Sequence, residues 1–165
     1  MITLKRFRRL EQAVREAGFG PSIEWSETIE QPKLATEFAS AAIYVIINGG
    51  MANAVAVHIY ARCLAALADK GSADRVYGHT GKAAAIDYIW NNRETLFQSY
   101  EAADDKLLFL ASLPFIGPVT RLHLAKNLGA DIAKPDVHLE RLARAEKTTT
   151  AKLCGRLARE TGYRV

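Results

Sequence analysis

Residues 113–120 read LPFIGPVT and lie between two segments, 104–113 and 119–129, whose apolar residues recur with helical spacing. A four-residue turn between two helices predicts a tight helical hairpin. We expect Gly117 to permit a positive φ and the close approach of another backbone. The first N–H groups of the second helix should point outward, where they can bind phosphate. An ordinary helical hairpin would need the glycine equally, so the turn alone does not decide between these interpretations.

The remaining sequence also predicts helices and contains no convincing strand. Apolar residues recur at helical spacing after Thr3, a potential cap, and Gly18 is expected to end that helix. Residues 18–32, GFGPSIEWSETIEQP, predict a turn-rich connector. Further helices are expected over 33–48, 51–71, 82–100 with a bend near Asn91 and Asn92, 136–146 and 148–162. We therefore predict an all-α fold in one domain, 1–165, with an N-terminal helix and connector (1–33), a helical core (34–104) and a hairpin segment (105–165).

Composition and charge are those of a globular protein with one basic region. Hydrophobic residues make up 49% and charged residues 24% of the 165 residues, and the net charge is +4. Residues 1–120 carry 12 Lys and Arg against 13 Asp and Glu, whereas residues 121–165 carry 10 against 5. That excess favours a polyanionic partner, although a solvated helical surface would look the same. The two cysteines form no CxxC pair, and no leader or membrane span is evident, which predicts a cytoplasmic protein, nucleoid-associated in a prokaryote.

The ordered motifs resemble the helix-hairpin-helix DNA glycosylase superfamily (HhH-GPD) of the endonuclease III type. In that family an L-P-G-[VI]-G-x-x-T-A hairpin precedes an apolar helix ending in Gly, and a V-D-T-H-V segment follows with an essential Asp. Residues 41–67 look like the paired helices around the family's DNA-wedging loop, and GHTGKAAAI (78–86) is similar to its loop with a Lys-Ala pair. The resemblance runs from about residue 38 to 161 and matches at Leu113, Pro114, Ile116, Gly117, Thr120, Gly129, Asp136 and His138.

The resemblance implies two helical lobes flanking a cleft that binds double-stranded DNA containing a damaged or modified base. It implies no metal and no cofactor, apart from a monovalent cation that the hairpin backbone would suit. Lys126 and Lys134 are interpreted either as surface lysines at helix ends or as phosphate contacts. The DNA-binding residues on this interpretation are Leu113, Phe115, Ile116, Gly117, Val119, Thr120, Lys126 and Lys134.

Several positions depart from the family pattern. Phe115 replaces the first Gly of the hairpin, and Pro135 precedes Asp136 where an apolar β-branched residue is usual. Val119 occupies the place of the lysine nucleophile of bifunctional members, and the cysteines of the iron–sulfur cluster are absent. Relatives continue with a further apolar helix beyond the point that corresponds to Val165. We expect the first helix, with Leu4, Phe7 and Leu10, or a second copy of the chain to cover the apolar stripe of Leu153, Leu157 and Ala158.

Asp136 is the carboxylate that the resemblance makes catalytic. A glycosylase breaks the bond between a base and C1′ through an oxocarbenium-like state, which a nearby carboxylate stabilises while it orients or deprotonates water. Asp136 is also well placed to cap the following helix, and the two roles are compatible. Without a lysine at 119, no amine is placed to form a Schiff base, so a monofunctional enzyme is expected.

A buried base must be flipped out of the duplex, and a side chain must fill the gap. We expect the NGGMAN loop (48–53) to supply a wedge, Met51 or Asn53, with Asn48 facing the base pocket. Equally, Gly49 and Gly50 could merely separate two helices, with Asn53 as the cap of the second. Trp25, Tyr44 and Trp90 could stack on the base, although aromatic residues at helical spacing more often pack in a core.

The sequence thus predicts a monofunctional DNA glycosylase. Two alternatives stay open: a non-catalytic helix-hairpin-helix DNA-binding module, and a bifunctional glycosylase/lyase that uses another amine. The sequence does not identify the base.

Overall fold

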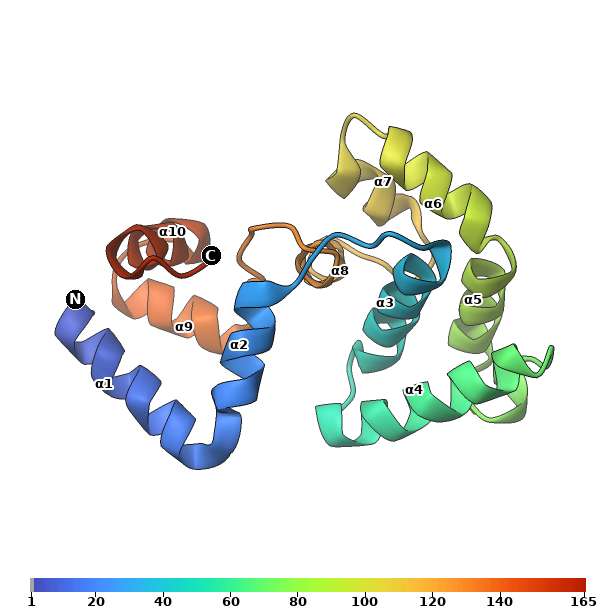
Figure 1. Cartoon of the computed structure of the whole chain (residues 1–165), viewed down its shortest axis with the longest axis horizontal. Helices are drawn as coiled ribbons and strands as arrows, with labels where there is room; N and C mark the ends of the chain where they lie inside the picture. The colour runs from blue at the N-terminus through green and yellow to red at the C-terminus, as the bar shows by residue number, and fades with distance from the viewer. Residues whose placement is uncertain (1) are drawn as a thin grey trace. The chain divides into compact units, whose positions relative to one another are not determined.

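The computed structural model describes residues 2–165, and these residues form helices and loops without a strand. The all-α prediction is therefore confirmed. The chain divides into two compact units, whose helices are labelled in Figure 1, where the colour follows the residue number. Unit 1 combines the residues up to Glu30 with Gly129–Val165, and unit 2 is Gln31–Leu128. No helix among the described residues is long and apolar enough to cross a membrane.

Unit 2 is built around α3 (Ala35–Asn48), whose residues Phe38, Ile43 and Ile46 are almost fully buried. The unbroken apolar run is helical because it is long and Ala-rich, and because Glu37 accepts hydrogen bonds from the Lys33 and Leu34 N–H groups at its start. The partners of α3 are α4 (Asn53–Ala68), α5 (Thr80–Asn91), α6 (Arg93–Ala102) and α8 (Thr120–Asn127). The short α7 (Lys106–Ser112) packs on α8, and η2 (Ala73–Arg75) on α4 and α5.

The predicted bend near Asn91 and Asn92 is a break between two helices. α5 ends at Asn91 and α6 begins at Arg93, with Asn92 at φ −106° and ψ 14° between them. The Asn92 side chain donates to the Tyr88 carbonyl at 2.8 Å, which satisfies one of the last carbonyls of α5.

Unit 1 contains α1 (Leu4–Val14), α2 (Gly20–Thr28), α9 (Val137–Ala145) and α10 (Thr150–Thr161) (Figure 1). Thr3 caps α1 as predicted, by accepting from the Arg6 N–H at 3.3 Å. Arg15–Phe19 forms a π-helical turn, in which Gly18 has φ 89° and redirects the chain. The prediction of a connector over residues 18–32 is wrong for residues 20–28, because Pro21 starts a helix as readily as it favours a turn.

The first helix and the last helix of unit 1 lie against each other. Leu153 of α10 is only 2% exposed, whereas Leu157 and Ala158 line a cavity together with Phe7 and Leu10, so α1 covers the stripe only in part. The packing is incomplete, because Leu10 of α1 stays half exposed. A cavity of about 410 Å³ lies among the four helices and is lined chiefly by Phe7, Leu10, Val14, Ile23, Leu142 and Leu157.

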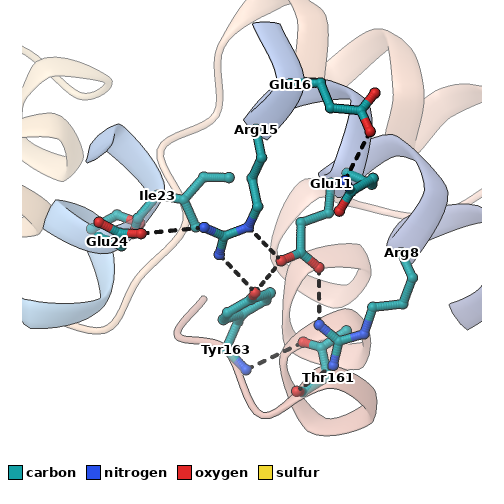
Figure 2. Close-up of polar contacts among 10 residues, drawn as sticks. Arg8, Glu11, Arg15, Glu16, Ile23, Glu24, Thr161 and Tyr163 are labelled. Atoms are coloured by element: carbon teal, nitrogen blue, oxygen red, sulfur yellow. Dashed lines mark hydrogen bonds and ion pairs between the residues drawn. The ribbon is translucent and has the colours of Figure 1, made fainter. Parts of the chain in front are cut away.

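The last residues of the chain tie the helices of unit 1 together. Figure 2 shows the Tyr163 hydroxyl donating to the Glu11 carboxylate, which also accepts from Arg8 at 2.9 Å and Arg15 at 3.1 Å. The hydrogen bond from Tyr163, followed by that from Arg8, lowers the pKa of Glu11 from 4.5 to about 2. The Arg8 guanidinium also lies over the Tyr163 ring, 5.3 Å from its centre.

Arg164 binds two loops at the edge of the same unit. Its guanidinium donates to the Ile29 carbonyl at 2.7 Å and to the Gly129 carbonyl, and its backbone N–H donates to Glu27 at 3.1 Å. The Val165 N–H donates to Asp131 at 2.6 Å. These bonds hold the end of α2 and the start of the 129–135 segment, which leads to Asp136.

Candidate nucleic-acid interface and carboxylate

The predicted hairpin is present in unit 2, between α7 and α8. Leu113 and Ile116 anchor it, since each is only 4% exposed, and the Ile116 N–H donates to the Leu113 carbonyl at 3.1 Å to close the turn. Asp105 caps α7 by accepting from the Leu108 N–H at 2.9 Å. The turn therefore has the rigid base that a backbone-contacting loop needs.

The conformation that we expected of Gly117 belongs to Phe115 instead. Phe115 has φ 60°, whereas Gly117 is not among the described residues with positive φ. The chain reverses directly after Pro114, so the residue that follows it takes the left-handed conformation, at a cost of about 1 kcal/mol for a residue with a Cβ. The Phe115 ring is half exposed and meets the His79 ring edge-on, with centres 5.8 Å apart, which offsets part of this cost.

Gly117 is held by Thr120. The Gly117 N–H donates to the Thr120 hydroxyl at 2.7 Å, and the Arg121 N–H donates to the Gly117 carbonyl at 2.9 Å. A Cβ on Gly117 would meet only that hydroxyl, at 3.9 Å, so the expected steric need for glycine here is not found. Thr120, which matches the family pattern, has a clear local role, because its hydroxyl accepts a hydrogen bond from the Gly117 N–H, which would otherwise have no partner.

The start of α8 presents two free donors. The backbone N–H groups of Val119 and Thr120 donate to no acceptor within residues 2–165, and Val119 is about half exposed. Pro118 precedes the helix by two residues rather than lying in it. Two adjacent N–H groups without a protein acceptor at a helix start can bind a phosphate oxygen, and this is the feature of the hairpin that suits DNA.

Asp136 lies in unit 1 as the N-cap of α9. Its Oδ1 accepts from the His138 N–H at 2.9 Å and from the Leu139 N–H at 2.8 Å, so the predicted capping role is confirmed. Within residues 2–165 no donor binds Oδ2, and the side chain is half-buried. The helix start therefore engages Oδ1, and the other carboxylate oxygen is available for a ligand. Lys134 lies two residues before it, whereas Lys126 is in the last turn of α8 in unit 2.

Three of the predicted base-pocket residues form one polar cluster in unit 2. Asn53 Oδ1 accepts from the Tyr44 hydroxyl and from the Asn48 amide, the latter at 3.1 Å. The Asn48 amide also reaches the Tyr44 hydroxyl at 3.3 Å. Ala52, not Asn53, occupies the N-cap position of α4, so the alternative of Asn53 as a cap is wrong. These three side chains connect the end of α3 to the start of α4, on either side of the loop of residues 49–52 that we expected to carry the wedge.

Lys82 fixes the same loop and was not recognised as a site residue in the sequence. Its ammonium donates to the Gly49 carbonyl at 2.7 Å, and burial lowers the pKa of Lys82. Gly50 has φ 79°, and the Met51 N–H donates to the Asn48 carbonyl at 3.0 Å, so the loop is a tight turn. Met51 itself is half-buried. The Lys-Ala pair of residues 82–83 was the signal that could have identified this lysine.

The aromatic candidates have separate environments. Trp25 lies on α2 in unit 1 and is 53% exposed, so our preference for core packing is wrong at this position. Trp90 is half-buried beneath the Arg93 guanidinium, 4.8 Å from the ring centre. Tyr44 meets Tyr60 edge-on at 5.5 Å, as part of the α3–α4 packing.

No group of three or more His, Cys, Asp or Glu side chains in residues 2–165 is arranged to hold a metal ion. In comparisons with known proteins, no family model, curated protein or solved structure matches the chain.

Proposed function

We propose that the protein is a monofunctional DNA glycosylase of the helix-hairpin-helix type, which hydrolyses the N-glycosidic bond of a damaged or modified base. The observation that carries the proposal is the order of two features along the chain. A hairpin whose Val119 and Thr120 N–H groups have no acceptor within residues 2–165 is followed by a carboxylate, Asp136, whose Oδ2 has no donor in the same residues. The first suits a DNA phosphate, and the second suits a sugar cation.

In this proposal Asp136 stabilises the positive charge that develops on the sugar as the base leaves. Oδ1 stays bound to the start of α9, which keeps the carboxylate oriented. Oδ2 faces the reacting sugar or accepts the proton of the attacking water. Val119 offers no amine, so water rather than the protein attacks C1′ and the product is an abasic site with an intact strand.

Tyr44, Asn48 and Asn53 are the proposed base-reading group, with Met51 in the adjoining turn as the wedge. Their hydroxyl and amide groups offer both donors and acceptors, as the edge of a flipped base requires. They already bind one another, so a base would have to replace one of these bonds. Trp25 and Lys134 belong to unit 1, and Lys126 to unit 2, where they serve as further candidates for DNA contact.

The test is a panel of duplexes, each with one damaged or modified base, incubated with the protein and analysed for released base. We expect release from at least one duplex, strand cleavage only after alkali, and no protein–DNA adduct after borohydride reduction. Release of no base from any duplex by a protein that binds DNA would contradict the proposal. An adduct with borohydride would instead show a lyase that uses some other amine, such as Lys82.

One observation favours the alternative of a non-catalytic DNA-binding module. The two N–H bonds to Oδ1 explain an Asp at position 136 by helix capping alone. On that alternative, the protein binds duplex DNA with and without a lesion equally well and releases nothing.

A further inference from the structure

Several cationic side chains between Gly129 and Val165 have no counterion among residues 2–165. Residues 129–165 carry eight Lys and Arg against five Asp and Glu. Four of those acids are already engaged: Asp131 by the Val165 N–H, Asp136 by α9, Glu146 by the Ile2 N–H and Glu160 by Arg156. The side chains without a hydrogen bond or ion pair to any residue of 2–165 include Arg141, Arg144, Lys147, Lys152 and Arg159.

Three cations form one stripe along α10. Lys152, Arg156 and Arg159 are related by i, i+4 and i+7, so they share one face of the helix. At 1.5 Å per residue, their backbone positions lie about 6 Å and about 4.5 Å apart along the axis. Arg156 donates to Glu160 and to the Ile2 carbonyl, each at 3.0 Å, and is thereby held in place, whereas Lys152 and Arg159 are exposed. We call these three residues the α10 basic face.

The α10 basic face borders a groove of about 640 Å³. Its other lining residues are the small or polar Thr148, Ala151 and Gly155, together with Glu146 and the buried Leu153. Gly155 adds no side chain to this groove, and a Cβ there would lie in ordinary contact with the Arg159 guanidinium, at 3.7 Å. The groove can therefore admit a narrow anionic chain alongside the three cations.

The groove does not suit a membrane surface. Helices that lie on membranes expose large apolar side chains beside their cations. In this groove Leu153 is 2% exposed, and the large exposed apolar residues of unit 1, such as Leu10, Phe19 and Trp25, do not line it. A polyanion that offers phosphates without an apolar phase is the better match.

We propose that the α10 basic face is a second DNA-backbone surface, separate from the hairpin, which belongs to unit 2. This inference rests on the proposed function, in so far as that function makes DNA the partner. Arg159 can direct paired N–H groups at a phosphate, and Lys152 adds a point charge, whereas Arg156 is already bound to Glu160 and the Ile2 carbonyl and adds only a fixed positive charge between them. Because phosphates carry no sequence information, this surface contributes to affinity on any duplex.

The experiment measures duplex binding by fluorescence anisotropy as a function of salt, for the wild type and for Lys152→Gln/Arg159→Gln. Each lost phosphate contact should reduce the slope of log K against log salt by about 0.9, so the double variant should lose about 1.8 of the slope. Affinity at low salt should fall at least tenfold. The matched control is Lys70→Gln/Arg75→Gln, which removes the same charge from exposed positions of unit 2.

A slope that is unchanged in Lys152→Gln/Arg159→Gln, or reduced equally in the control, would overturn the inference. So would stronger binding of the wild type to phosphatidylserine vesicles than to DNA, lost in the same variant. Thermal unfolding of both variants confirms that they fold. Base release on the same duplexes separates the two proposals. If the wild type releases a base but the salt slope of Lys152→Gln/Arg159→Gln is unchanged, only the second DNA surface is refuted, and if the slope changes but no base is released, only the glycosylase activity is refuted. If the wild type does not bind DNA, both proposals are refuted.

Discussion

Replacing Glu11 by Gln removes the charge that Tyr163, Arg8 and Arg15 bind in unit 1. A fall of the Glu11 pKa from 4.5 to about 2 would correspond to roughly 3 kcal/mol of folding free energy if it were fully expressed. The side chains of Arg8 and Arg15 are 47% and 33% exposed, so solvent screens both ion pairs. We therefore expect Glu11→Gln to lower the free energy of unfolding of unit 1 by about 1–2 kcal/mol at neutral pH.

The pH dependence has a defined sign. The folded-state pKa lies below the unfolded value, so the stabilisation is fully present above about pH 4.5 and is lost as the pH falls through about 2. The unfolding free energies of the wild type and Glu11→Gln should therefore differ at pH 7 and converge towards pH 2.

The two tryptophans allow each unit to be followed separately. Trp25 lies in unit 1 and Trp90 in unit 2, and the sequence contains no other Trp. In a Trp90→Phe background, the fluorescence of Trp25 during urea unfolding reports on unit 1, and Trp25→Phe reports on unit 2. Glu16→Gln is the control, since it removes the same charge where only Gln12 donates. The reasoning would be refuted if Glu11→Gln lost no more unfolding free energy than Glu16→Gln. It would also be refuted if the difference in unfolding free energy between the wild type and Glu11→Gln were the same at pH 2 as at pH 7.

Three further substitutions test the local structure of the proposed site. Gly117→Ala should change the unfolding free energy by less than about 0.5 kcal/mol, because its φ is not positive, whereas Gly129→Ala, at φ 82°, should cost about 1 kcal/mol or more in the same urea titration. Thr120→Val should cost about 1–2 kcal/mol by leaving the Gly117 N–H unpaired, and Thr120→Ser should restore most of it. Asp136→Ala should cost about 1 kcal/mol through loss of the α9 cap, whereas Asp136→Asn should keep nearly full stability; equal losses for both would contradict the capping role.

The sequence predicts those parts of the fold that depend on local chemistry. The helices of unit 2 and the Thr3 and Asp136 caps follow from apolar spacing and from side chains that reach their own helix start. Helix α2 was missed because Gly20 and Pro21 favour a turn and a helix start equally, and its apolar spacing is weak.

Contacts between distant residues could not be predicted in this way. The bonds of Tyr163 to Glu11 and of Arg164 to Ile29 join residues more than 130 positions apart. Phe115 takes the left-handed conformation in a turn where the glycine was the local choice, and His79, from another part of the chain, supports it. The i, i+4 spacing of Tyr44 and Asn48 on α3 was visible in the sequence, but the closing bond to Asn53 depends on the turn at Gly50.

The most direct test of the central claim is a single-turnover excision assay of Asp136→Asn on a duplex from which the wild type releases a base. Asp105→Asn is the matched control, because Asp105 caps α7 through one carboxylate oxygen just as Asp136 caps α9. We predict that Asp136→Asn lowers the excision rate constant on the order of 10²-fold or more with DNA affinity nearly unchanged, and that Asp105→Asn changes neither. A correctly folded Asp136→Asn protein that excises at the wild-type rate would contradict the account.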